Sequence, residues 1–191
     1  GDAAREKGIA LSIHGPYYIN LATPDPEKAE KTKGHLMKSL RAARWMGAAK
    51  VVFHPGGTSG MDREEAMKRA RDMLSQVVED ARTEGLDDIK LAPETMGKPA
   101  LLGSVEEVIE LCKVAENVVP TVDFAHLHAL CGGKLIAKED FARVLDCLEE
   151  GLSPEVVRNL HVHFSPVEYT AAGEKRHRNL LDEGFGRILR H

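Results

Sequence analysis

Five short apolar runs, each with an ionisable residue at its last or next-to-last position, constrain this chain of 191 residues more than any other feature. The runs span residues 9–14, 49–54, 89–95, 118–124 and 157–164. Longer helical patterns separate them, and strands that alternate with helices predict a parallel sheet. We therefore expect an α/β fold with about five βα units, either an open doubly wound sheet or a (β/α)8 TIM-type barrel, in one domain over residues 1–191.

The segments between the runs have the periodicity and end signals of helices. We expect helices over 26–46, 62–85, 104–117, around 125–131 and 137–150. Residues 165–191 are polar, basic and punctuated by glycine, and we expect a loop that leads into a final helix. No Gly-x-Gly-x-x-Gly turn or Walker loop follows any of the predicted strands, so neither nucleotide-binding version of the fold has support.

The composition is that of an ordinary globular domain, with 42% hydrophobic residues and a net charge of −4. This charge gives no general reason to expect nucleic acid as a partner, although a local site can still be electropositive. Three widely spaced cysteines without CxxC spacing predict free thiols in a reducing compartment. Because no apolar run reaches about 20 residues, we expect no membrane role. A cytoplasmic monomer is the expectation.

Polar side chains follow all five strands at the point where each strand ends. They are His14, His54, Glu94, Asp123, His126 and His161. The carboxyl ends of parallel strands lie at one edge, so these groups should converge. A histidine at a single strand end is ordinarily a hydrogen-bonded core residue, but five such ends in succession fit that explanation poorly. Burying so many ionisable groups together is costly without a compensating cation.

The types of ligand narrow the choice of metal. Imidazole mixed with carboxylate, without thiolate, suits Zn²⁺, Mn²⁺ or Fe²⁺. The number of candidates exceeds one tetrahedral site and predicts two or three ions, an arrangement used in phosphoryl transfer. The breaks "GP" after His14 and "PGG" after His54 leave the mouth of the site uncrowded.

These residues resemble those of the endonuclease IV family, zinc-dependent apurinic/apyrimidinic endonucleases built on a xylose-isomerase-like TIM barrel. The resemblance is carried by "HGPYYIN", "FHPGG", "ET", "VDFAH", "LHVH" and "KRHRNLLDEGFG", between residues 14 and 186. It implies a zinc-dependent hydrolase of base excision repair that cleaves DNA at abasic sites.

The resemblance also implies roles for individual residues at the first two zinc sites. His14 and His54 match ligands of the first zinc. Glu94 matches the carboxylate that bridges the first and second ions, and it is the catalytic residue that we expect. Asp123 and His161 match ligands of the second zinc.

The third zinc site departs from the family pattern. His126 and His177 match two of its ligands, but the aspartate expected two residues before the histidine is replaced by Lys175, with Glu174 adjacent. If Glu183-Gly184 sets the register instead, the histidine position falls on Arg178. Tyr17 matches a family aromatic that contacts DNA beside the abasic site, and a rim aromatic that only packs on its loop is an equal alternative.

Two further departures concern the last strand and the length of the chain. The family often has Asn-Asp where this chain has His163-Phe164, so His163 is either a supporting group or an alternative ligand. The resemblance begins at what would be the third barrel strand and stops before the eighth, which supplies a further glutamate ligand in the family. We expect part of a barrel of about 250 residues or more, and a truncated barrel with two unpaired parallel edges is the alternative.

Two other functions remain open at the level of sequence. A sugar isomerase or epimerase of the same superfamily would hold one Mn²⁺ or Mg²⁺ mainly through carboxylates, whereas His14 and His54 add two imidazoles that such a site does not need. A non-catalytic relative is the third reading, favoured by Lys175 and by the missing glutamate.

Overall fold

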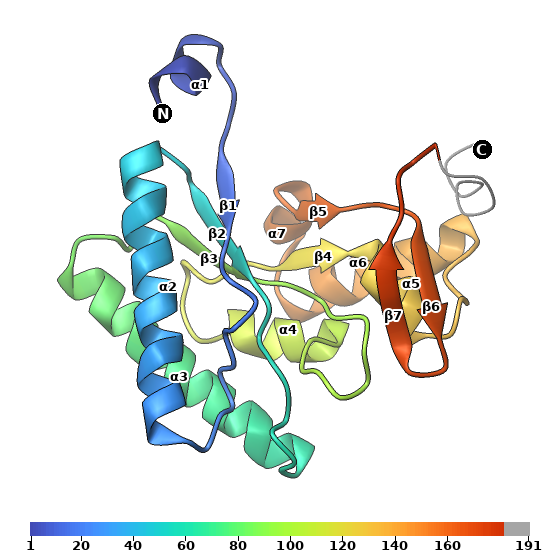
Figure 1. Ribbon diagram of the computed structural model, residues 1–191. Coiled ribbons are helices and arrows are strands. Elements are labelled where there is room, and N and C mark those ends of the chain that lie inside the picture. Colours follow the sequence, from blue (N-terminus) through green and yellow to red (C-terminus); the bar gives the residue numbers. More distant parts are fainter. Residues whose placement is uncertain (182–191) are drawn as a thin grey trace.

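The computed structural model describes residues 1–181, and it has the predicted alternation of strands and helices (Figure 1). The helices are α1 (Asp2–Glu6), α2 (Pro26–Met46), α3 (Arg63–Thr83), α4 (Val105–Cys112), α5 (Phe124–Leu130), α6 (Lys138–Gly151) and α7 (Pro154–Arg158). The strands are β1 (Ser12–His14), β2 (Lys50–Phe53), β3 (Lys90–Pro93), β4 (Thr121–Asp123), β5 (His161–His163), β6 (Val167–Thr170) and β7 (Gly173–His177). The predicted final helix lies outside the described residues.

The first five strands form an incomplete barrel wall in chain order. β1, β2 and β3 make one parallel sheet, and β4 pairs with β5 in parallel. Two isolated parallel bridges, Leu91 to Val118 and Glu94 to Thr121, join β3 to β4. Within residues 1–181 the sheet does not close, because β1 and β5 each pair on one side only. The prediction of a (β/α)8-type fold with an incomplete barrel is confirmed.

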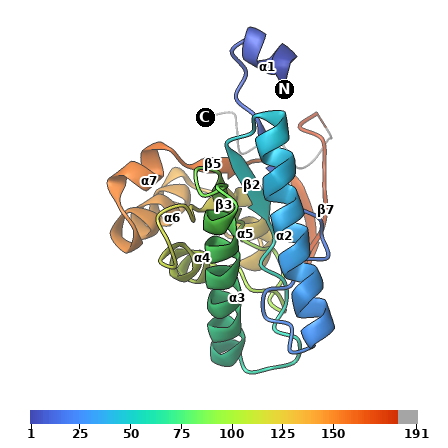
Figure 2. The same ribbon diagram turned by 90° about the vertical axis from the view of Figure 1, so that its left-hand side faces the viewer.

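The helices cover the outside of this wall, and α2 and α3 lie side by side (Figure 2). α2 has the bounds that its sequence signals predict. The Asp25 side chain accepts hydrogen bonds from the backbone N–H groups of Glu27 and Lys28, Pro26 occupies the first turn, and Gly47 ends the helix at φ 74°. The inward stripe of α2 includes Leu36 and Leu40, which are fully buried.

The region after β5 differs from the expected loop. β6 and β7 form an antiparallel hairpin with a register shift at Glu168/Tyr169. The hairpin packs on α5, so residues that show little hydrophobic alternation are ordered by tertiary contact. The helix predicted over 104–117 also ends earlier, at Cys112, because tight turns carry the chain from there to β4.

Candidate metal centre

A cavity of about 730 Å³ opens at the carboxyl ends of the strands. Its lining includes most of the predicted ligands, together with residues of β5 and β7. The ionisable and aromatic residues that line it are His14, Tyr17, His54, Glu94, Lys98, Asp123, His126, His163, Phe164, Glu174 and His177. The strand ends therefore converge on one site.

Glu94 lies at the centre of this cluster and is almost completely buried. Its Oε2 lies 3.0 Å from Nε2 of His14 and 3.4 Å from Nε2 of His54, and its Oε1 lies 2.8 Å from Nδ1 of His163. Burial raises the pKa of Glu94, but the hydrogen bonds with His14, His163 and His54 outweigh burial and hold the pKa well below its usual range. Glu94 is thus an ionised carboxylate contacted by imidazoles from three strand ends.

A second group forms where β4 runs into α5. The backbone N–H of His126 donates to Oδ1 of Asp123 at 2.9 Å, so this carboxylate caps α5. Nε2 of His126 lies 3.2 Å from Nε2 of His177 on β7. Burial raises the pKa of Asp123, and the pKa stays raised although the charge of His126 acts in the opposite direction.

The hydrogen bonds of the imidazole rings show which ring nitrogen is available to bind a cation. Nδ1 of His126 lies 2.8 Å from the Thr95 carbonyl oxygen, and Nδ1 of His14 lies 2.7 Å from that of Gly15. A carbonyl oxygen can only accept, so Nδ1 carries a proton in both rings, and Nε2 of each ring is the nitrogen that is left to bind a metal ion. The Nε2 of His14 faces an oxygen of ionised Glu94, and two lone pairs at this distance repel unless a proton or a metal ion lies with them.

Three overlapping sets of donor atoms could each hold an ion. They are His14, His54 and Glu94; Asp123, His126 and His177; and Glu94, Asp123 and His163. Within each set the donor atoms lie within 4.8 Å of one another, compared with roughly 3.3 Å expected between two ligands of one tetrahedral zinc. Because Glu94 and Asp123 each belong to two sets, the donor chemistry fits a cluster of zinc ions.

Five of the six residues predicted at the strand ends come together, and His161 does not join them. The parallel register pairs His163 with Asp123 but pairs His161 with Thr121, two residues further from the mouth. His161 is absent from the three donor sets, whereas His163 belongs to one. The signal was present in the sequence, since of two histidines on one face of a strand the later one lies at the carboxyl end.

The β6–β7 hairpin carries the residues that the sequence left open at the third set. Nε2 of His177 faces the cluster, whereas Arg178 donates to Glu168 at 2.9 Å. Lys175 also pairs with Glu168, at 3.0 Å. The carboxylate of Glu174 points inward, and its Oε2 lies 3.8 Å from Nε2 of His126. Glu174 therefore approaches the place where the family pattern led us to expect an aspartate.

Tyr17 lies at the rim of the cavity, as its predicted role requires. Its side chain is 78% exposed. Its ring stacks on that of His14 with centroids 5.8 Å apart and meets that of His54 edge-on at 5.0 Å. The ring thus borders the site while presenting most of its surface to solvent.

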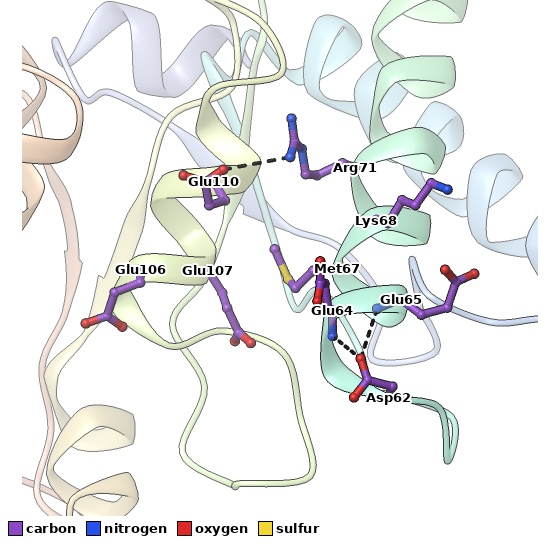
Figure 3. A pocket seen from close by; sticks show the side chains of 9 residues that line it. All are labelled: Asp62, Glu64, Glu65, Met67, Lys68, Arg71, Glu106, Glu107 and Glu110. Carbon is purple, nitrogen blue, oxygen red and sulfur yellow. Dashed lines mark hydrogen bonds and ion pairs between the residues drawn. The ribbon is translucent and has the colours of Figure 1, made fainter.

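A second hollow, between α3 and α4, is strongly acidic (Figure 3). Its carboxylates have structural explanations. Asp62 caps α3, Glu107 belongs to a capping box with Ser104, and Glu110 pairs with Arg71 at 3.8 Å. Acidic residues in first helical turns complement the helix dipole, so these carboxylates are accounted for without a metal ion.

Comparison with known proteins supports the family that the sequence resemblance predicted. The family model of the xylose isomerase-like TIM barrel matches residues 1–189. An uncharacterized protein of Methanocaldococcus jannaschii is 30% identical over 93% of this chain and 64% of its own length. A probable endonuclease 4 of Acholeplasma laidlawii is 30% identical over 96% of this chain and 62% of its own length. The chain thus spans about three fifths of these relatives.

Solved structures of an endonuclease IV and of an epimerase-like protein superpose on this chain. Endonuclease IV from Thermus thermophilus superposes with a TM-score of 0.73 at 26% identity, covering 94% of this chain and 63% of that one. A D-tagatose 3-epimerase-like protein shares the fold, with a TM-score of 0.68 at 21% identity over 88% of this chain and 61% of that one. None of the helices in the described part of the chain is both long and apolar enough to cross a membrane. The predicted resemblance to endonuclease IV is confirmed, and the chain belongs to the xylose isomerase-like TIM barrel family.

Proposed function

We propose that this chain holds zinc in its cavity and hydrolyses the DNA phosphodiester beside an abasic site. The observation that carries this proposal is the sharing of Glu94 and Asp123 between donor sets, which suits adjacent ions and a phosphate better than a lone ion. The 30% identical relative named as a probable endonuclease 4 adds support.

The residues that would hold zinc follow from the three donor sets. His14 and His54 would hold one ion with Glu94, and Glu94 would bridge to a second ion held by Asp123 and His163. Bound ions of this kind act as Lewis acids toward a phosphoryl oxygen and make water more acidic. A third ion would lie with Asp123, His126 and His177, and the nearby Glu174 supplies a further oxygen.

The other groups of the chain orient these ligands and the substrate. The Thr95 carbonyl fixes the His126 ring with Nε2 toward the cavity. Ser165 does the same for His177, through a contact of 2.7 Å between Oγ and Nδ1. Tyr17 would stack in the gap left by a missing base.

The test combines metal analysis with cleavage. We expect zinc-loaded protein to nick a duplex that carries one abasic site and to leave the intact duplex uncut. Glu94→Gln should lose more than one zinc equivalent by atomic absorption, because this carboxylate serves two ions. Zinc-loaded protein that treats both duplexes alike would refute the repair function, and an unchanged zinc content in the variant would refute the bridging role.

A sugar epimerase is the second candidate. The set of Glu94, Asp123 and His163, with two carboxylates and one imidazole, also suits a single Mn²⁺ or Mg²⁺. If this function is correct, one manganese per chain should support epimerisation of a ketohexose, measured by chromatography of the sugars. Activity on sugars without cleavage of abasic DNA would favour it.

A further inference from the structure

We infer that Lys98 is an anion-binding residue of the metal centre, where it would contact a phosphate of the substrate. The inference deepens the proposed function and rests on it. Lys98 lies on the loop of residues 97–103, between β3 and α4, and it lines the same cavity as the predicted ligands. It is the one lysine or arginine among the described residues of that lining.

The charge balance of the site gives the first reason. Three carboxylates line the cavity, from Glu94, Asp123 and Glu174, yet within residues 1–181 no ion pair joins Lys98 to any of them. Glu94 and Asp123 contact imidazoles instead. If two or three divalent ions occupy the centre, a lysine ammonium beside them is repelled unless an anion lies between. A phosphate would compensate both charges, whereas a neutral sugar would not.

The anchoring of the loop on its inner side gives the second reason. The backbone N–H of Glu174 donates to the Gly97 carbonyl at 2.9 Å. Two glycines make this close approach possible, because a Cβ on Gly173 would lie 2.2 Å from the Gly97 oxygen and 3.0 Å from Cα of Lys98. The backbone of Lys98 is therefore fixed against the hairpin that delivers Glu174 and His177 to the centre.

Arg63 anchors the outer side of the same loop. Its guanidinium donates to the carbonyl oxygens of Pro99 at 2.8 Å and Leu101 at 2.9 Å. It also pairs with Glu107, which lines the acidic hollow of Figure 3. Arg63 thus ties the loop to the wall of the acidic hollow, while Lys98 and Leu101 of the same loop line the metal cavity. Lys98 extends from a backbone held on both sides, which reduces the entropic cost of placing its ammonium on a ligand.

The experiment measures anion binding separately from activity. Methylphosphonate is titrated into the zinc-loaded chain of 191 residues, and binding is followed by phosphorus NMR. We expect Lys98→Gln to weaken methylphosphonate binding about tenfold, since a charge-assisted hydrogen bond is lost. Lys98→Arg should retain most of the affinity. Lys38→Gln, a change at an exposed lysine on α2, should have no effect, and all three variants should keep the zinc content of the wild type.

A second measurement uses DNA. The affinity for a duplex with a non-cleavable abasic analogue is determined at several salt concentrations. Loss of one phosphate contact should lower the slope of log affinity against log salt by about 0.9 in Lys98→Gln and leave it unchanged in Lys38→Gln.

The outcomes separate this inference from the proposed function. If Lys98→Gln binds methylphosphonate as tightly as the wild type, or if the wild type does not bind it, the role of Lys98 is refuted even where abasic DNA is cleaved. If abasic DNA is not cleaved but methylphosphonate binding depends on Lys98, the anion site stands and the DNA substrate is wrong.

Discussion

At the scale of single residues, the position along a strand decides which histidine reaches the centre. His161 and His163 occupy the same face of β5, and their ring centroids lie 5.3 Å apart. Burial and the nearby charge of Lys50 lower the pKa of His161, whereas the hydrogen bond with Glu94 raises the pKa of His163. The pKa values of these two neighbouring imidazoles are therefore shifted in opposite directions.

This difference leads to a paired prediction. His163→Ala should reduce the bound zinc by about one equivalent, because it removes a donor from the set with Glu94 and Asp123. His161→Ala should keep the zinc content of the wild type and serves as the matched control. Atomic absorption on both purified variants measures the outcome. The reverse result would restore the assignment that the sequence resemblance implies.

Tyr17 gives a prediction about the substrate. Stacking of a base on an aromatic ring contributes about 1–3 kcal/mol. If Tyr17 fills the gap at an abasic site, Tyr17→Ala should weaken binding to abasic duplex by roughly 10- to 100-fold. Fluorescence anisotropy with abasic and intact duplexes measures the change, and the zinc content should stay constant. An equal loss on both duplexes would mean that the ring does not recognise the missing base.

At the scale of elements, the β6–β7 hairpin is the part of the centre that depends most on close packing. It carries Glu174 and His177, and its turn touches the loop after β3. At Gly97 a Cβ would lie 2.7 Å from Cβ of Glu174, and at Gly173 it would strike the Gly97 carbonyl. Any side chain at these glycines must push the hairpin away from the cavity.

Gly173→Ala and Gly60→Ala form a matched test of this packing. Both glycines have positive φ, 97° and 78°, so both changes should cost about 1–2 kcal/mol in backbone strain. Only Gly173 meets other atoms, since a Cβ on Gly60 has nothing within 4 Å. We expect Gly173→Ala to cost more free energy of unfolding in urea and to lose zinc at the set that includes His177. Equal costs and equal zinc contents would contradict this role of the turn.

At the scale of the whole molecule, the centre joins segments that are distant in sequence. The described sheet is open, and its donor residues come from the ends of β1, β2, β3, β4 and β5, from α5 and from β7. Bound ions would therefore cross-link segments from most of the described chain. Metal binding should stabilise the folded chain as a whole.

Thermal unfolding tests this coupling. With free zinc at about 100 times the dissociation constant, one site should add about 2.7 kcal/mol. For a chain of this size, that corresponds to a rise in Tm of roughly 5–11 °C. Circular dichroism melts with zinc and after chelation measure the shift, and Glu94→Gln should show a smaller one. Superimposed melts of the wild type would show that the chain binds no zinc in its folded form.

The sequence by itself determined the alternation of elements and most of the centre. Apolar runs bounded by helix caps are local signals, and they placed α2 at its bounds and located five parallel strands. The convergence of His14, His54, Glu94, Asp123 and His126 followed because parallel strands share one carboxyl edge. These inferences needed only the spacing of apolar residues in each helix and strand and the direction of the chain.

The tertiary structure decided what depends on register and on contact between distant segments. The order along the strand favoured the later histidine, and the pairing of β5 with β4 sets His163, and not His161, level with Asp123. The hairpin lacks a strong alternation, and it is ordered by packing on α5 and by the close approach of Gly97 and Gly173. The inward place of Glu174 and the position of Lys98 depend on that approach, which no local pattern encodes.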